Sequence, residues 1–292
     1  MLTFKELARF LDSVEREKSK KGKVGLAATF LTPLQSDDLT STLYLLADNT
    51  ANGTGPKTLM AAISELGDMS QFGKILRSTG DVGDAVSASI EFEFIQASIT
   101  REPLYVGEVS EILRVSSKGS SRTGKKGLLK KLISRCSPLE SKYLVRIIVR
   151  DLRVGFSRGL LLNGLSIALD SDEDTVRRMA AFSPIHEIPE QIGRAGLDVP
   201  RLFSPFRPML AQPASSADEI IKRHGETSLE RKIDGFRAMI HKSGSTIKIY
   251  SRSPQDVTEK LPDVVRIAKN FDGNFIIDCE IAGFKNGRIM PF

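Results

Sequence analysis

The feature that most constrains the fold of this 292-residue chain is a change of hydrophobic period on either side of a proline-rich stretch. Up to about residue 190, apolar residues recur at three- and four-residue spacing, which is typical of helices. Between Val199 and Ala217, prolines stand at positions 200, 205, 208 and 213, and they exclude a regular helix. Beyond this stretch, residues such as Ile247 and Ile249 alternate with polar ones, as in strands. Two domains joined by an extended linker are therefore predicted.

We place the domain boundary between residues 203 and 204. Residues 1–203 are predicted to be all helical, beginning with an amphipathic core helix that carries Leu7, Phe10, Leu11 and Val14 on one face. Residues 204–292 are predicted to form a mixed α+β domain with antiparallel strands. A Ser-Gly-Ser break at 243–245 predicts a hairpin over 236–250, residues 275–284 are β-rich, and a second turn is expected at residues 286–287.

The positive charge of the chain is concentrated in one segment. The net charge is +6, and residues 114–158 contain thirteen Lys and Arg against two acids. Such a patch indicates a polyanionic partner. The overall composition, with 40% hydrophobic and 27% charged residues, is that of a folded protein rather than a disordered one.

The two cysteines, Cys136 and Cys279, are too few and too far apart for a disulfide framework or a cysteine-based zinc site. No apolar run approaches the length that spans a membrane. We therefore expect a soluble protein of the reducing cytoplasm.

The most specific motif is Lys-x-Asp-Gly-x-Arg at residues 232–237. In an extended backbone Glu230, Lys232 and Asp234 project to one side, and Lys232 becomes a nucleophile only if desolvation or a nearby cation, such as Arg237 or a metal, lowers its pKa. Gly235 allows close approach of a ligand to the backbone. A short charged string is usually a surface strand, but this pattern is expected by chance only ~0.003 times in such a chain.

A second acidic motif lies about forty residues downstream. Asp278 and Glu280 alternate with Ile277, Cys279 and Ile281, so the two carboxylates are expected to face together, away from the core. Two carboxylates on one face attract a divalent cation. Without the lysine motif, a solvated strand face would be the better interpretation.

These motifs resemble those of a known enzyme family. The segment 232–237 looks like the nucleotidyl-lysine motif of ATP-dependent DNA ligases, which RNA ligases and messenger-RNA capping enzymes share. The segment Tyr250–Ser253 is similar to the ligase segment in which an arginine, here Arg252, lies near the nucleotide. The segment Phe275–Glu280 is similar to the ligase strand that carries the acidic pair.

The resemblance implies a role for each matching residue. Lys232 would attack the α-phosphate of ATP and carry AMP, with Asp234 and Gly235 beside it. Glu230 would lie near the adenine, and Arg237 and Arg252 near the sugar and phosphates. Glu280 would lie near the ribose or the metal. That metal, Mg²⁺ or Mn²⁺, would be held by Asp278 and Glu280.

The first domain resembles the helical DNA-binding domain of archaeal and eukaryotic DNA ligases, most clearly over residues 137–155, 80–83 and the linker segment 207–211. Independently of the family, basic residues at 142, 146, 150 and 153 would form one stripe of a single helix. Such a stripe is often just a solvated face, but the preceding loop, residues 116–127, adds four cations, three glycines and no acid. The predicted DNA contacts are Lys118, Arg122, Lys125, Lys126, Lys142, Arg146, Arg150 and Arg153.

A near-match to a nucleotide-binding P-loop at residues 119–126 is rejected, because Lys126 stands where a Ser or Thr should hold magnesium. A helical pattern, not a buried strand, also precedes it.

The resemblance thus implies an ATP-dependent DNA ligase fragment that acts on nicked duplex DNA and is associated with the nucleoid, with a sliding clamp as a candidate partner. The chain ends on Met290-Pro291-Phe292, inside a motif that the family begins with Pro-Phe, so we expect the later motifs and the closing OB-fold domain to be missing and nick sealing by this chain to fail. The intact enzyme is expected to be monomeric, and the shortened chain could self-associate. The alternatives are a non-catalytic DNA-binding or scaffold module with a vestigial site, and an RNA ligase or capping-type transferase.

Overall fold

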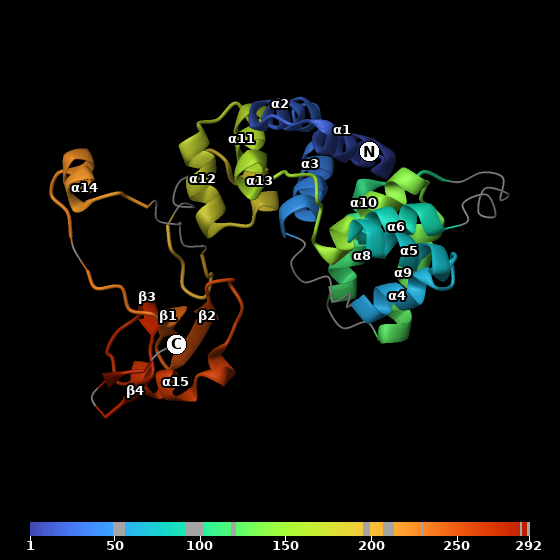
Figure 1. Cartoon of the computed structure of the whole chain (residues 1–292). Helices are drawn as coiled ribbons and strands as arrows, with labels where there is room; N and C mark the ends of the chain where they lie inside the picture. The colour runs from blue at the N-terminus through green and yellow to red at the C-terminus, as the bar shows by residue number, and fades with distance from the viewer. Residues whose placement is uncertain are drawn as a thin grey trace. The chain divides into compact units, whose positions relative to one another are not determined.

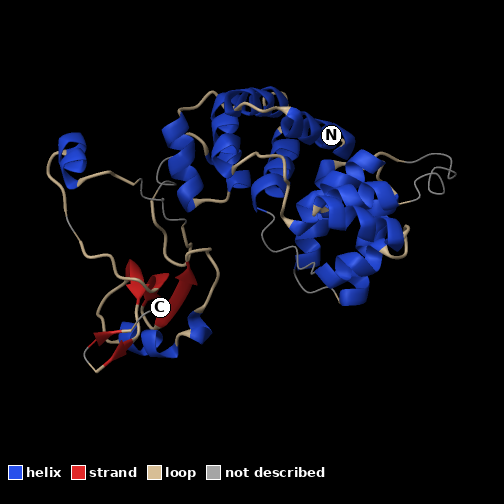
Figure 2. Ribbon diagram, viewed as in Figure 1, coloured by secondary structure: helices blue, strands red, loops and turns tan. Residues whose placement is uncertain are grey.

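The computed structural model describes residues 1–48, 56–90, 102–117, 121–194, 199–206, 213–228, 230–286 and 288–290. The chain divides into two compact units, Met1–Ala180 with Pro184–Gly193, and Ala181–Ser183 with Arg194–Phe292. The first unit is helical and the second contains the sheet strands (Figure 2), which confirms the predicted fold class. The exact boundary between residues 203 and 204 stays a prediction, and the linker segment 207–211 lies outside the described residues.

The helical unit can be traced in Figure 1. Its elements are α1 (Phe4–Arg16), α2 (Lys20–Leu31), α3 (Ser36–Leu43), the π-helix η1 (Tyr44–Asp48), α4 (Pro56–Ile63), α5 (Met69–Thr79), α6 (Val82–Ser89), α8 (Val106–Ser117), α9 (Arg122–Ser134), α10 (Pro138–Val149), α11 (Arg158–Ala168), α12 (Glu173–Phe182), η2 (Ile185–Glu187) and α13 (Ile188–Gln191).

Local sequence explains where key helices begin. Thr3 and Ser137 are the N-caps of α1 and α10, and each forms a reciprocal capping box with a glutamate three residues later, Glu6 or Glu140. Pro138 occupies the first turn of α10, where its missing N–H costs nothing. The predicted apolar face of the first helix is confirmed, since it contributes Leu7, Phe10, Leu11 and Val14 to the main core of the unit.

The second unit holds a three-stranded antiparallel sheet in the order β2 (Thr246–Ser251), β1 (Phe236–Ser243) and β3 (Phe275–Ile281). The predicted hairpin is confirmed, because β1 and β2 pair with Ser243 opposite Thr246. The turn near residue 286 is confirmed by the pairing of Lys285 with Arg288, although Gly287 itself lies outside the described residues. The elements are α14 (Ala217–His224), β1 (Phe236–Ser243), β2 (Thr246–Ser251), η3 (Thr258–Lys260), α15 (Pro262–Lys269), β3 (Phe275–Ile281), β4 (Phe284–Lys285) and β5 (Arg288–Ile289).

The two faces of this sheet are covered differently. One face, with Ala238, Ile240 and Ile249, packs under α15 and Val257. On the other face, the backbone N–H of Phe203 donates to Nδ1 of the buried His241 at 2.9 Å, and the Tyr250 hydroxyl donates to the carbonyl of Phe203 at 3.2 Å. Burial lowers the pKa of His241, which favours its neutral form. The segment around Phe203 is thereby fastened to the sheet.

Candidate functional site

A pocket opens at the end of the sheet where β1 begins and where β2 and β3 end. Its volume is about 830 Å³, within the range of small-molecule sites. Three of its sides come from the start of β1, from the segment after β2, and from the end of β3. It is lined by Lys232, Ile233, Gly235, Phe236, Arg237, Ser251, Arg252, Ser253, Gln255, Val257, Lys260, Leu261 and Glu280.

Lys232 reaches this pocket from an exposed, irregular segment. Its side chain is 85% exposed and forms an ion pair with Asp234, which is 74% exposed. The hydrogen bond to Asp234 and the charges of Asp234 and Glu280 raise the pKa of Lys232. Desolvation, Arg237 or a bound metal could lower this pKa, but in the described structure Lys232 is exposed and its charged neighbours are acidic, so the amine is held protonated.

Arg237 does not approach the amine of Lys232 as a free cation. Its guanidinium donates two hydrogen bonds to Asp278, at 3.1 and 2.7 Å. This bond raises the pKa of Arg237. Arg237 lies opposite Glu280 in the β1–β3 register, and Met239 lies opposite Asp278. The prediction that Asp278 and Glu280 share a face is confirmed by this register, which also sets that face opposite the Ile240 core face.

Gly235 is required by the closeness of β3. Its backbone N–H donates to Glu280 Oε1 at 3.1 Å. A Cβ at this position would lie 2.5 Å from the carbonyl oxygen of Ile281 and 3.2 Å from Cγ of Glu280. The glycine therefore lets the segment that carries Lys232 pass directly beside the acidic strand.

The predicted nucleotide residues are not all gathered in one place. Lys232, Gly235, Arg237, Arg252 and Glu280 line the pocket. The described lining does not include Glu230 or Asp234, which are exposed, nor Asp278, which lines a separate hollow of about 480 Å³. The roles given to these residues remain proposals.

The sequence analysis missed Lys260 as a pocket residue. It ends η3, and no spacing relative to the recognised motifs marks it. The turn that presents it is fixed by Asp256, which accepts hydrogen bonds from the Lys248 ammonium at 2.7 Å and from the backbone N–H of Thr258 at 3.0 Å. The ion pair with Lys248 and the bonds from Thr258 lower the pKa of Asp256 to about 2.

The described residues fit a nucleotide and its cation in their chemistry. Four cations, on Lys232, Arg237, Arg252 and Lys260, surround a pocket that contains one carboxylate, Glu280. Within the described ranges, no group of three or more metal-ligating side chains is present. Magnesium is commonly held by one or two carboxylates together with substrate phosphates, so Glu280, with or without Asp278, is a sufficient protein contribution.

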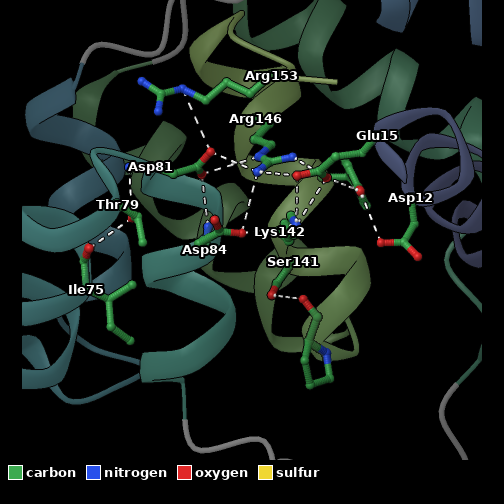
Figure 3. A network of polar contacts seen from close by, with 12 residues as sticks. Asp12, Glu15, Ile75, Thr79, Asp81, Asp84, Ser141, Lys142, Arg146 and Arg153 are labelled. Carbon is green, nitrogen blue, oxygen red and sulfur yellow. Dashed lines mark hydrogen bonds and ion pairs between the residues drawn. The ribbon is translucent and has the colours of Figure 1, made fainter. Parts of the chain in front are cut away.

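In the helical unit, the predicted single stripe of basic residues is wrong. Helix α10 ends at Val149, and Arg150 and Arg153 follow it with left-handed φ values of 62° and 53°. Arg146 is only 2% exposed and donates to Glu15 and Asp81, each at 2.8 Å, while Lys142 contacts Glu15 and Asp84 (Figure 3). Arg146 therefore holds α1, α6 and α10 together, and a direct contact with a partner would first require this network to open.

The charges in this network reinforce one another. Burial alone would raise the pKa of Glu15, but hydrogen bonds from Arg146, Tyr143 and Lys142 outweigh it and lower that pKa to about 2. Burial similarly opposes the effect of Arg146 on Asp81, whose pKa is lowered overall. Sequence reasoning missed the network because Glu15 and Asp81 lie 131 and 65 residues before Arg146.

The expected basic loop is mostly helix. Helix α8 extends to Ser117 and α9 begins at Arg122, so Lys125 and Lys126 lie within α9, capped by the Ser121 hydroxyl. Lys118 lies outside the described residues. The helix before the rejected P-loop sequence is as predicted, and it excludes the strand that such a loop requires.

No helix in the described part of the chain is both long and apolar enough to cross a membrane.

Comparison with known proteins agrees with both units. Residues 3–166 match the family model described as DNA ligase N terminus, and residues 208–292 match that of the ATP dependent DNA ligase domain. The DNA ligase of Methanocaldococcus jannaschii is 32% identical over 86% of this chain and 46% of its own length. DNA ligase 1 of Methanosarcina acetivorans is 30% identical over 100% of this chain and 54% of its own length.

DNA ligase 1 of Korarchaeum cryptofilum is likewise 30% identical over 100% of this chain and 55% of its own length. The chain thus spans about half the length of the curated relatives it matches. Because two DNA ligase family models match in series, the comparisons favour a DNA ligase over the alternative of an RNA ligase or capping-type transferase. By these two matches, the chain belongs to the family of ATP-dependent DNA ligases.

Proposed function

We propose that this chain binds nicked duplex DNA through its helical unit and takes AMP from ATP onto Lys232. The observation that carries the proposal is the pocket in which Lys232 meets Arg237, Arg252, Lys260 and Glu280 at the end of the sheet. A lysine in a pocket that three further cations also line suits a triphosphate, whose oxygens are satisfied by charge-assisted hydrogen bonds.

In the first step, the Nζ of Lys232 attacks the α-phosphorus of ATP. A phosphorus–nitrogen bond forms and the bond to the departing pyrophosphate breaks. The ammonium group gives up two of its three protons, one before the attack and one as the phosphoramidate forms. Since Asp234 holds the amine protonated, Lys232 must leave this partner before it can attack. Asp234 is also the nearest carboxylate that could receive a proton from the amine.

In the later steps, AMP passes from Lys232 to the 5′-phosphate at the nick, and the adjacent 3′-hydroxyl displaces it to seal the strand. Arg237 and Arg252 are proposed to neutralise charge on the phosphates and Glu230 to lie by the adenine. A divalent ion, Mg²⁺ or Mn²⁺, held by Glu280 and Asp278, supplies further charge neutralisation when bound. The protein's own contribution is positioning, on which phosphoryl transfer largely depends.

We also propose that the 292-residue polypeptide, tested alone, does not seal nicks. Lys232 is exposed and paired with an acid, so the site is not pre-organised for attack. The proposed setting is the cell interior, with nicked DNA as substrate and a sliding clamp as a candidate partner.

Incubation with α-labelled ATP and Mg²⁺, followed by denaturing electrophoresis, tests the nucleophile. Label is expected on the wild-type chain and absent from both Lys232→Ala and Lys232→Arg, because an arginine stays protonated and cannot attack. Lys269→Ala, an exposed lysine on α15, is the control and should keep its label. A wild-type chain that binds duplex DNA but takes no label would favour the non-catalytic DNA-binding module instead.

A further inference from the structure

Helix α9 carries a compact group of lysines outside the segment that resembles the ligase family most clearly. Its core side is made by Leu129, Leu132 and Ile133, which are at most 2% exposed. The helix contains no acidic residue. The side chains of Lys126 and Lys130, one helical turn apart, remain 34% and 43% exposed.

A single carboxylate bridges these two lysines. Helix α4 packs against α9 (Figure 1), and Glu65, shortly after α4, places Oε1 at 2.5 Å from the Lys126 ammonium and Oε2 at 2.9 Å from that of Lys130. The Glu65 side chain is itself 40% exposed. Each carboxylate oxygen thus serves one ammonium group, on a surface open to solvent.

We propose that Glu65 is an intramolecular counterion that occupies the place of a DNA phosphate on α9. Two oxygens of one anion, each contacting one lysine, are what a phosphodiester would offer to the same pair through its two non-bridging oxygens. DNA would displace Glu65 and take over Lys126 and Lys130. This proposal rests on the proposed DNA binding of the helical unit, and it adds the surface and its built-in competitor.

The contrast with α10 supports this choice of surface. Lys142 and Arg146 are 17% and 3% exposed in their side chains and are held by several buried or half-buried carboxylates. Exposed ion pairs, such as those of Glu65, are worth little in stability and exchange readily. The lysines of α9 can therefore be released to a phosphate without dismantling a core.

An intramolecular counterion also changes the salt dependence of binding. Ions condensed on DNA are released to solution when lysines bind phosphates, which makes affinity fall with salt. A lysine that first has to exchange a tethered carboxylate binds more weakly, and the tethered group is not diluted by the surrounding solution. Removal of Glu65 should therefore strengthen binding and increase its dependence on salt.

The test uses the 292-residue chain and a fluorescent 30-base-pair duplex, with binding followed by anisotropy over a range of NaCl concentrations. Glu65→Gln is expected to bind roughly threefold or more tightly at moderate salt, and to steepen the slope of log affinity against log salt by about one to two. Glu173→Gln is the matched control, because it removes the same charge from an exposed pair with Arg177. It should behave as the wild type does.

A second background shows whether the effect runs through the two lysines. In a Lys126→Gln, Lys130→Gln variant, the added Glu65→Gln change should have no further effect on affinity or slope. An equal gain from Glu65→Gln and Glu173→Gln, or a gain that persists without the two lysines, would overturn the proposal while leaving DNA binding intact. Absence of duplex binding by the wild-type chain would overturn both.

Discussion

Arg146 and Lys232 are both cations beside carboxylates, yet the two units place them in opposite surroundings. The Arg146 side chain is 3% exposed and is shared by carboxylates from two other helices, whereas Lys232 is 85% exposed and meets a neighbour two residues away. Burial makes the Arg146 pairs expensive to break, because an unpaired buried charge has no water to solvate it. The Lys232 pair can be exchanged for a ligand at little cost.

The difference separates a charge that organises the fold from a charge that is available for chemistry. Nearly every donor of Arg146 is occupied, including one that reaches the carbonyl of Leu152 at 3.3 Å. The described lining of the candidate pocket, by contrast, holds four cations and one carboxylate, although Lys232 and Arg237 also pair with carboxylates outside that lining. A surplus of cations in a pocket indicates an anionic ligand, while balanced charges in a core indicate stability.

The largest expected effect on stability comes from replacing Arg146. The change Arg146→Met removes the buried cation between Asp81 and Glu15 and should lower the free energy of unfolding by ~3–5 kcal/mol. Urea unfolding followed by circular dichroism at 222 nm, which reports mainly on the helices, measures the loss. The control Arg266→Met disrupts an exposed pair with Asp263 and should cost less than ~1 kcal/mol; equal losses would mean that burial is not what distinguishes the two pairs.

At the candidate pocket, the equivalent change is Gly235→Ala. The new Cβ would press on the Ile281 carbonyl and on Glu280, at a cost of about 1–3 kcal/mol for overpacking. Covalent labelling by ATP should fall about tenfold or more, since 1.4 kcal/mol corresponds to a factor of ten. Gly25→Ala, where an added Cβ meets nothing within 4 Å, should keep its labelling rate; a Gly235→Ala variant with normal labelling would show that the close approach to β3 does not matter.

A smaller loss of stability is expected when the pH is lowered. The folded-state pKa of Glu15 is about 2, below its usual 4.5, so its contribution to stability is complete above about pH 4.5 and is lost as the pH falls toward 2. Because the Glu15 side chain is 29% exposed, we discount for screening and expect a loss on the order of 1–2 kcal/mol. Urea midpoints of wild type and Glu15→Gln between pH 6 and pH 3 should converge as the pH falls, and parallel curves would contradict the assignment.

Much of the fold could be predicted from local sequence patterns. The features that could not be predicted depend on residues that are far apart in the sequence or on backbone contacts. The hairpin, the acidic face of β3 and the first helix were predictable because period and turn residues act over a few positions. The end of α10 was not, because the backbone after Val149 is set by contacts such as the one from Arg146 to Leu152. The spacing of the basic residues alone could not distinguish an exposed stripe from a buried arginine that links helices through ion pairs.

The candidate site shows the same division. The motif around Lys232 and the acidic strand could be recognised, since both are contiguous in sequence, and the register then brings Arg237 opposite Glu280. The place of Lys260 in the pocket depends on how a turn folds back onto the sheet. The hydrogen bond from Phe203 to His241 depends in the same way on a linker segment. The role of His241 is not visible in the sequence, because its partner is a backbone amide, which no side-chain motif reveals.

The exposure of Lys232 has an entropic consequence. A lysine that is fixed in one conformation gives up as much as ~2 kcal/mol of rotamer freedom, and little packing restrains this side chain before a nucleotide arrives. If the phosphates of a nucleotide fix the Lys232 amine in one position, part of the binding free energy must therefore offset the side-chain entropy that is lost. A nucleoside without phosphates, which leaves Lys232 free to move, would escape this cost and bind by its base and sugar contacts alone.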